Sequence, residues 1–380
     1  MSPPEQSALV DTAWHDVLQW LPPNLDQMAK EEFGFRRRGS FQTAADVLRM
    51  ALAYSVCDLS LRSTAAWLTT RGLGDISDVA VLGRLRRAQT FLARALASLL
   101  AMRVQRTPCA NVPYKVRMLD GTCVSAPGAT GAEWRIHATF DAARGVVDCI
   151  ELTTDKGGEH LERSNPQSGD LLVADRGYAH ARRLLAIRTL EAHFLIRIGH
   201  NAVPMVDEKG LPFDPLAFAK QVRKKHEDFD VREAPIVYLR ADTARSHPLR
   251  LILVRKSGEA TQRDRRRTEK SATKKGKIPT QRTLDATAFV FLLTSVHAVS
   301  KETLAQLYRV RWQIEVNFKR WKSIFDLDLL RADDPDLARA YIYSKLIATC
   351  LADTLSCSAR AFSPWGLPLA PADMASGSLA

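Results

Sequence analysis

The spacing of apolar positions divides the chain into a helical first part and a mixed second part. Over the first 105 residues, apolar side chains recur every three or four positions, which is typical of amphipathic helices. Helices are expected over 8–21, 43–56 and 63–70, and a longer one is expected from Ser77 or Asp78, either of which can cap it, to Met102. We therefore assign residues 1–110 to a helical domain.

The last two of these helices are joined by the turn "RGLGDIS", and the second helix carries Arg84, Arg86 and Arg87. This arrangement is typical of helix-turn-helix proteins that read DNA. Two packed helices with a glycine-containing turn also occur in helical domains of other function. Both interpretations of the domain stay open at the level of the sequence.

From about residue 115 the pattern changes to short alternating or apolar runs, which predict strands. The runs "KVRMLD", "EWRIHATFD" and "GVVDCIELTTD" are separated by turns, as in a β-meander. The runs "DLLVADRGY" and "HFLIRIG" predict two more strands, with the helix "AHARRLLAIRTLEA" between them. Further strand-like runs, "APIVYLRAD", "PLRLILVRK" and "TAFVFLLTSV", lie between 200 and 300. Strands followed by alternating helix and strand indicate an α/β fold with a mixed sheet.

A strong amphipathic helix is predicted from Ser300 onward. At 100° per residue, four of its polar side chains fall within a strip about 60° wide: Tyr308, Arg311, Glu315 and Lys322. The apolar positions beside this strip are Leu307, Ile314, Phe318, Trp321 and Phe325. The polar strip therefore lies against a packed seam, where a rigid element can aim the carboxylate of Glu315. We also expect Trp312 and Trp321 to be core residues.

An ordinary pattern of ion pairs is the alternative explanation of this strip. Arg311 and Glu315, or Glu315 and Lys319, have the spacing at which charged side chains pair on a helix. Such pairs account for the alternation of charge but not for the tyrosine in the same strip.

The charge of the chain favours an anionic partner. The formal net charge is +12 over 380 residues, and nucleic acid is the simplest partner for such an excess because its phosphates release counterions when they are neutralised. Residues 255–282 hold eleven Lys or Arg against three acids. This basic segment is predicted as a loop, which is either a solvated flexible connection or a mobile arm that lies along a phosphate backbone.

The remaining composition indicates a cytoplasmic protein. Six cysteines are scattered without a close pair, so we expect reduced thiols and not a zinc site. No apolar run is long enough to span a bilayer, and the N-terminus lacks the pattern of a signal peptide. We expect no membrane partner.

Two acids follow predicted strands directly. Asp120 comes after "KVRML" and before Gly121, and Asp175 comes after "LLVA" and before "RGY". Taken singly, an aspartate after a strand is usually a turn former or a helix cap. Two of them at the carboxyl ends of strands in one sheet are more informative, because α/β sheets bind ligands at that edge.

Together with Glu315, these aspartates can hold metal ions. Two divalent cations need several oxygen ligands, and carboxylates suit Mg²⁺ or Mn²⁺. Such a pair of ions can catalyse in-line phosphoryl transfer. Arg311, Lys319 and Lys322 could hold flanking phosphates, and Tyr308 could bond a phosphate or pack against a sugar. Further polar features lie near the proposed site: Glu159 as an extra acid, and His137, His160 and His180, of which no pair has metal-ligand spacing.

Tyr308, Arg311, Glu315 and Lys322 form the pattern Y-x2-R-x3-E-x6-K. In this pattern, and in "LDGT" around Asp120 and "ADRGY", the chain resembles the DDE transposases of bacterial insertion sequences, in the branch called insertion-sequence family four. The resemblance covers about residues 115–335.

The resemblance implies a ribonuclease H-like catalytic fold with Asp120, Asp175 and Glu315 as its metal-binding triad. In this division, 111–200 and 300–345 form the catalytic domain, 200–300 form a β-rich insertion, and 346–380 form a C-terminal helix and tail.

It further implies an enzyme that binds the inverted-repeat ends of a mobile element, cleaves them and joins the 3′ ends to target DNA with two Mg²⁺ or Mn²⁺ ions. Its active form would be a homodimer on double-stranded DNA, associated with the nucleoid, with Tyr308, Arg311, Lys319 and Lys322 contacting DNA. Two alternatives are an inactive DNA-binding protein of transposase descent and a metal-dependent nuclease that does not join strands.

Overall fold

The computed structural model describes residues 14–33, 41–103, 112–126, 129, 131–221 and 230–361. The chain forms two compact units. The first is made of Met1–Val104, Val124–Glu133 and Lys319–Ala380, and the second of Gln105–Cys123 and Trp134–Phe318. Each unit has its own core, so each is described separately.

The first unit is helical. Its helices are α2 (Leu25–Phe33), α3 (Ala44–Ser55), α4 (Leu61–Thr70), α5 (Asp78–Ala101) and α12 (Pro335–Ala361), together with the last turns of α11. Side-chain caps fix three starts, because Thr43, Ser60 and Ser77 each accept a backbone N–H of the first turn. These starts confirm three predicted helices. Of the helix predicted over 8–21, the part before residue 14 lies outside the described residues, and α2 was not predicted.

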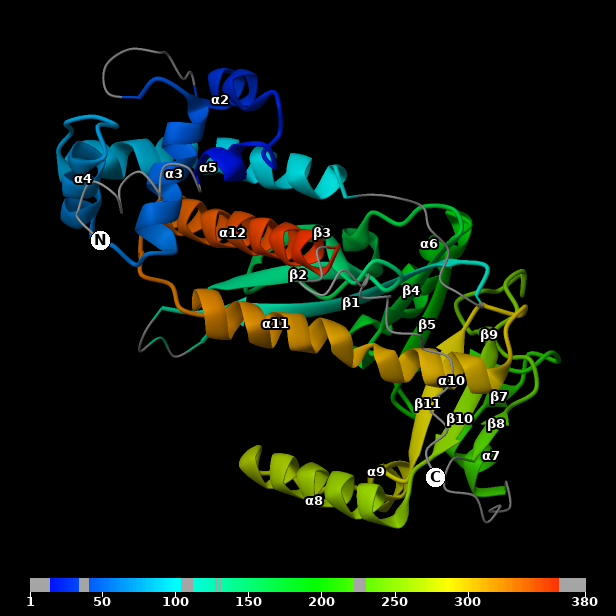
Figure 1. Ribbon diagram of the computed structural model, residues 1–380. Coiled ribbons are helices and arrows are strands. Elements are labelled where there is room, and N and C mark those ends of the chain that lie inside the picture. Colours follow the sequence, from blue (N-terminus) through cyan, green and yellow to red (C-terminus); the bar gives the residue numbers. More distant parts are fainter. Residues whose placement is uncertain are drawn as a thin grey trace. The chain divides into compact units, whose positions relative to one another are not determined.

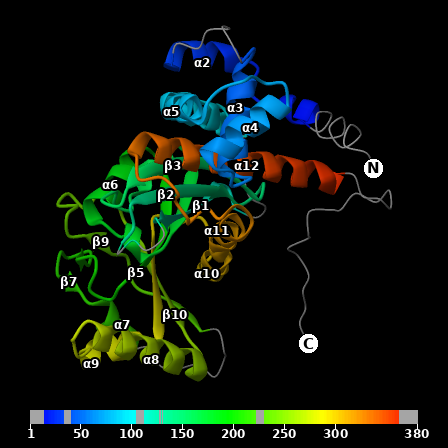
Figure 2. The same cartoon turned by 90° about the vertical axis from the view of Figure 1, so that its left-hand side faces the viewer.

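Packing against α12 holds the helical unit together. This helix lies alongside α5 and α3 in both views (Figures 1 and 2). It begins at Pro335, so the prediction of a C-terminal helix from 346 was too short. Its Tyr341 stacks edge-on against Tyr54 of α3, with ring centroids 5.8 Å apart. The Lys345 ammonium lies over the Tyr341 ring and donates to the Asp326 carbonyl oxygen.

All three arginines expected to read DNA on α5 contact the protein itself, and Arg87 does so by donating to the Gly83 carbonyl oxygen. Arg86 forms an ion pair of 3.1 Å with Asp334, and Arg84 lies over the Phe41 ring. Seven residues separate α4 from α5, more than the short turn of a helix-turn-helix motif. A DNA-reading role for this helix pair stays a prediction.

The second unit is built on one large mixed sheet. Its strands are β1 (Lys115–Val124), β2 (Trp134–Asp141), β3 (Val146–Thr154), β4 (Asp170–Ala174), β5 (His193–Ile198), β8 (Val231–Glu233), β10 (Arg250–Arg255) and β11 (Phe289–Thr294). Their order is β3-β2-β1-β4-β5-β11-β10-β8. β4 runs parallel to β1 and β5, whereas β11 is antiparallel to β5 and β10. This arrangement confirms the predicted mixed α/β class.

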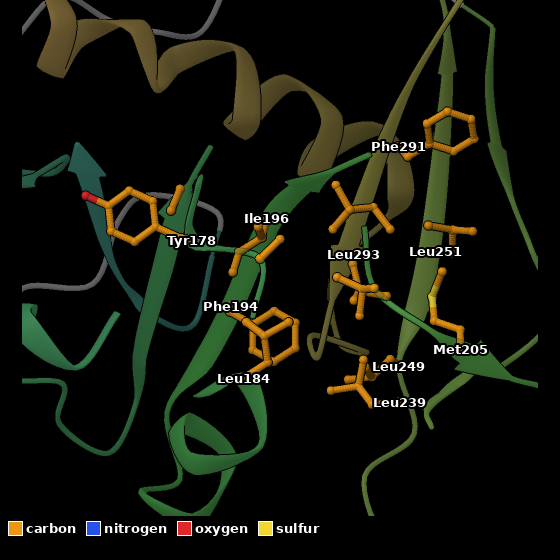
Figure 3. Packing of buried hydrophobic residues seen from close by; sticks show 14 of the residues in the cluster. Tyr178, Leu184, Phe194, Ile196, Met205, Leu239, Leu249, Leu251, Phe291 and Leu293 are labelled. Atoms are coloured by element: carbon orange, nitrogen blue, oxygen red, sulfur yellow. The ribbon is translucent and has the colours of Figure 1, made fainter. Parts of the chain in front are cut away.

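The segment 200–300 contributes three strands, β8, β10 and β11, to this same sheet. Its other strands, β6 (Met205–Val206), β7 (Pro212–Phe213) and β9 (Tyr238–Leu239), form a small separate sheet. Figure 3 shows Phe194 of β5, Leu251 of β10 and Leu293 of β11 in one apolar cluster with Met205 and Leu239 of the small sheet. The segment therefore shares the core of the strands that precede it.

The basic segment 255–282 is not a loop. Most of it is the helix α8 (Gly258–Lys274), followed by α9 (Gln281–Ala286) (Figure 1). The Ser257 side chain caps α8 by accepting the Ala260 N–H, and Glu259 lies in the first turn and Lys274 in the last, where each charge suits the helix dipole. No residue of α8 is buried. The prediction failed because α8 consists mainly of charged and polar residues, so no stripe of large apolar side chains marks it as a helix.

The helix predicted from Ser300 onward is present in two pieces, α10 (Lys301–Val310) and α11 (Trp312–Phe325), with the Ser300 side chain as the cap. Ile314, Phe318 and Trp321 are buried as predicted. The prediction that Trp312 is a core residue was wrong, because its side chain is 54% exposed.

Two broad features concern the expected class of protein. Among the described residues, no helix combines the length and apolar character needed to cross a membrane. The cysteines that the structure describes with their side chains, Cys57, Cys123, Cys149 and Cys350, are free thiols.

Candidate active site

The register of the sheet places the two predicted aspartates beside each other. In the parallel pair of β1 and β4, Met118 lies opposite Val173. Asp120 and Asp175 each follow two residues later, so both side chains point to the same face of the sheet. Asp120 lies within β1, which continues to Val124, whereas Asp175 directly follows β4 and starts the short 3₁₀ helix η2 (Arg176–Tyr178). The sequence-based placement of Asp120 at the very end of its strand was therefore off by four residues.

Tyr308 of α10 reaches Asp175. Its hydroxyl donates to the Asp175 Oδ1 atom at 3.3 Å. Burial, and then the charge of Asp175, raise the pKa of Tyr308 to about 12. The phenol therefore keeps its proton at neutral pH and acts as a donor to the carboxylate.

Arg311 joins the other two acids. Its guanidinium donates to Asp120 Oδ2 at 3.4 Å and to Glu315 Oε1, one turn further along the chain. Burial opposes the charge of Arg311, but Tyr308, Asp120 and Glu315 outweigh that effect, so its pKa is raised. The structure thus gathers Asp120, Asp175, Tyr308, Arg311 and Glu315 within the second unit.

The helix is tightened where it carries these residues. The Arg311 N–H bonds the Tyr308 carbonyl, and the Ile314 N–H bonds the Arg311 carbonyl. Both bonds span three residues instead of four, so the junction of α10 and α11 is a turn of 3₁₀ type. Arg311 itself keeps helical backbone angles.

Asp120 titrates far from its ordinary range. Burial raises its pKa to about 6, although the Gly121 N–H and Arg311 act in the opposite direction. The nearby carboxylates of Glu315 and Glu159 raise it further. A carboxylate held in this way gains strongly from any additional positive charge placed beside it.

Glu159 and three histidines surround this centre without joining it. Glu159 is within 3.8 Å of Arg135. Burial, and then Arg163 and Arg135, lower the pKa of His137 to about 4, so His137 is neutral and bonds Thr153 through Nε2. The rings of His160 and His180 meet edge-on. The roles of Glu159 and the three histidines stay predictions.

Lys319 and Lys322 belong to the helical unit and not to the unit of the acids. Lys319 is exposed, and Lys322 approaches Asp328 to 3.9 Å. Their predicted contacts with DNA remain predictions.

The acids provide the donor atoms that Mg²⁺ or Mn²⁺ prefers, since all are carboxylate oxygens. Within the described ranges, however, no three His, Cys, Asp or Glu side chains stand close enough to share one ion. The reason is visible in the contacts, because the guanidinium of Arg311 lies between Asp120 and Glu315. A metal site at these acids therefore stays a prediction.

Comparisons with known proteins show the family of the chain. Residues 112–351 match the family described as "Transposase DDE domain". The chain is 34% identical over 360 residues to the transposase for insertion sequence element IS421 of Escherichia coli, covering 92% of this chain and 96% of that protein. InsL of insertion sequence element IS186A, from Escherichia coli K12, is 34% identical over 359 residues with the same coverage.

Among solved structures, a piggyBac transposase synaptic complex with hairpin DNA is similar at 10% identity and a TM-score of 0.46, covering 90% of this chain and 74% of that one.

The fold and the site thus define a transposase of the DDE class, whose family match runs from β1 to α12. Within that class, the chain belongs to the DDE transposases of bacterial insertion sequences, alongside the IS421 and IS186 proteins.

Proposed function

We propose that this transposase binds the inverted-repeat ends of its element, cleaves them and joins the 3′ ends to target DNA with two divalent metal ions. The observation that carries the proposal is the common position of Asp120 and Asp175 on adjacent parallel strands, with Arg311 joining Asp120 to Glu315. Negative carboxylates that share a site repel one another, so a bound cation beside them would be favourable.

Asp120, Asp175 and Glu315 would hold the ions, which fits a ribonuclease H-like fold. These three acids would hold Mg²⁺ or Mn²⁺, which would supply the positive charge needed to activate a water or a 3′-hydroxyl and to stabilise the leaving oxygen. Tyr308 keeps the Asp175 carboxylate in place through its hydroxyl. Arg311, released from Asp120, becomes available to a phosphate of the DNA, to which a guanidinium binds through two N–H groups.

Lys319 and Lys322 would contact further phosphates of the element end, because they follow Glu315 by one and two turns on α11. As in its family, the active protein would be a homodimer assembled on double-stranded DNA. Each of the two subunits would then bring its site to one of the two element ends.

A cleavage and joining assay tests the proposal. We expect Glu315→Gln to lower end cleavage at least a hundredfold, or about 2.7 kcal/mol of transition-state stabilisation, because a carboxamide carries no charge for a cation. End binding and the circular dichroism spectrum should be unchanged. Glu302→Gln is the matched control, since Glu302 is an exposed acid on α10 that pairs with Lys301, and it should cleave like the wild type.

The two rival functions give different products. Wild-type protein that binds ends without any cleavage would make it an inactive DNA-binding protein. Nicked ends that are never joined to target DNA would make it a nuclease. Full cleavage by Glu315→Gln would remove Glu315 from the mechanism.

A further inference from the structure

A hollow of about 780 Å³ opens beside Asp175 within the second unit. It lies between α8 and the ends of β5 and β11, and α8 stands apart from the sheet in Figures 1 and 2. Its basic lining residues are Arg176, Arg197, Lys256, Arg267, Lys275 and Lys277. The acids that line it are Asp175 and Asp264. The lining of the hollow is therefore mainly basic, and it includes the carboxylate of Asp175.

One face of α8 forms a wall of this hollow. The lining positions of the helix are Asp264, Arg267, Thr268, Ser271, Ala272 and Lys275. Their spacing of three and four residues places them on a single side of the helix. The opposite side carries Arg263, Arg266 and Lys270, which do not line the hollow. The opposite face therefore carries the larger net charge, because Asp264 lies on the lining face with Arg267 and Lys275.

The charge of the hollow is available to a ligand. Lys256 pairs with Asp264 and donates to the Thr287 carbonyl oxygen, so these two charges are used within the protein. Arg267, Lys275 and Lys277 are exposed. Burial, and then Arg282, lower the pKa of His200, which also lines the hollow and therefore adds no charge at neutral pH. Serine and threonine hydroxyls complete a surface suited to phosphate oxygens.

The length of α8 along the hollow suits the backbone of one DNA strand. From Asp264 to Lys275, α8 rises about 16 Å, which equals the rise of about five base pairs at 3.4 Å each. The cap at Ser257 and the anchoring of Lys256 fix the start of the helix. The basic segment is therefore a preformed wall and needs little ordering when a ligand binds.

We propose that this hollow binds the phosphate backbone of the target DNA. The inference rests on the proposed function, because joining requires a second DNA segment to reach the carboxylates that hold the element end. Arg311 and Tyr308 contact the acids from α10 and its junction with α11, whereas the hollow reaches Asp175 beside η2 and along α8. Its lining of Lys, Arg, Ser and Thr suits contacts with phosphates, which carry no sequence information. Such sequence-independent contacts suit target DNA.

A triple variant tests the proposal in the full-length protein. Arg267→Gln, Lys275→Gln and Lys277→Gln together should lower joining of precleaved element ends to a target plasmid at least tenfold, with end cleavage changed less than twofold. The salt dependence of binding to an unrelated duplex should flatten by up to about 2.7 in log–log slope, because three phosphates would no longer be neutralised. The matched control is Arg263→Gln, Arg266→Gln and Lys270→Gln, which removes the same charge from the other face and should keep both joining and cleavage within about threefold.

A variant that conserves the charge tests whether the glutamine variant loses joining through lost charge or through misfolding. Arg267→Lys, Lys275→Arg and Lys277→Arg should join ends as the wild type does. Equal loss of cleavage and joining in the glutamine variant would show that the hollow binds the element end, and equal behaviour of the two glutamine variants would show that only total charge matters. Either result overturns the proposal. Wild-type protein that fails to join ends at all would instead contradict the proposed function.

Discussion

Arg311 contacts two of the three acids singled out by the sequence. Its guanidinium holds Asp120 and Glu315 together where the sequence predicted metal ions. The sequence singled out all five residues of the centre, because strand ends and helix spacing are readable as patterns. It could not show that Arg311 bonds the acids directly, since side-chain contacts over 191 positions depend on the folded sheet. It also could not show that Trp312, next to the seam, faces outward.

The raised pKa of Asp120 has a measurable effect on stability. Its folded-state pKa of about 6 exceeds the ordinary value of 3.8, so the folded protein holds the proton more tightly than the unfolded chain does. Stability is therefore lost as the pH rises from about 4 to 6. We predict that Asp120→Asn removes this loss and stabilises the protein by about 2 kcal/mol more at pH 7.5 than at pH 4, measured by urea unfolding. A difference that does not change with pH for Asp120→Asn would contradict the burial argument.

At the scale of elements, the helix α8 shows where sequence patterns fail. Strands and buried helices were predicted because their apolar residues repeat at a fixed period. α8 buries no residue and consists mainly of charged and polar side chains, so it has no stripe of large apolar residues. Only its cap at Ser257 and the pairing of Arg265 with Glu269 identify it. Because α8 buries no residue, its folding should contribute little to the hydrophobic core.

We predict that Ser257→Ala loosens α8 without changing global stability. Loss of the cap costs about 1 kcal/mol, which should speed hydrogen exchange of α8 amides about fivefold while the unfolding midpoint stays unchanged, because α8 packs no side chain into the core. Ser77→Ala removes the corresponding cap of α5, whose Phe91 and Leu92 are buried. That variant should lower the midpoint itself. A fall of the midpoint with Ser257→Ala would mean that α8 is part of the cooperative fold.

At the scale of the whole molecule, the class was predictable and the assembly of the sheet was not. The runs of β1 to β5 and the intervening helix are present much as the sequence indicated. The strands β8, β10 and β11 come from a segment expected to interrupt the catalytic fold, yet they continue its sheet through the pairing of β11 with β5. Pairing between strands about 100 positions apart leaves no local pattern, because each strand has the same alternation whichever neighbour it meets.

The central claim is that Asp120, Asp175 and Glu315 bind paired divalent ions in exchange for Arg311. The most direct test is anomalous diffraction from crystals of the protein with an element end and Mn²⁺. We predict two anomalous peaks at about 2.1 Å from carboxylate oxygens of these residues, with the Arg311 guanidinium moved from Asp120 to a phosphate. Peaks elsewhere, or Asp120 and Glu315 still bonded to Arg311 at saturating Mn²⁺, would contradict the account.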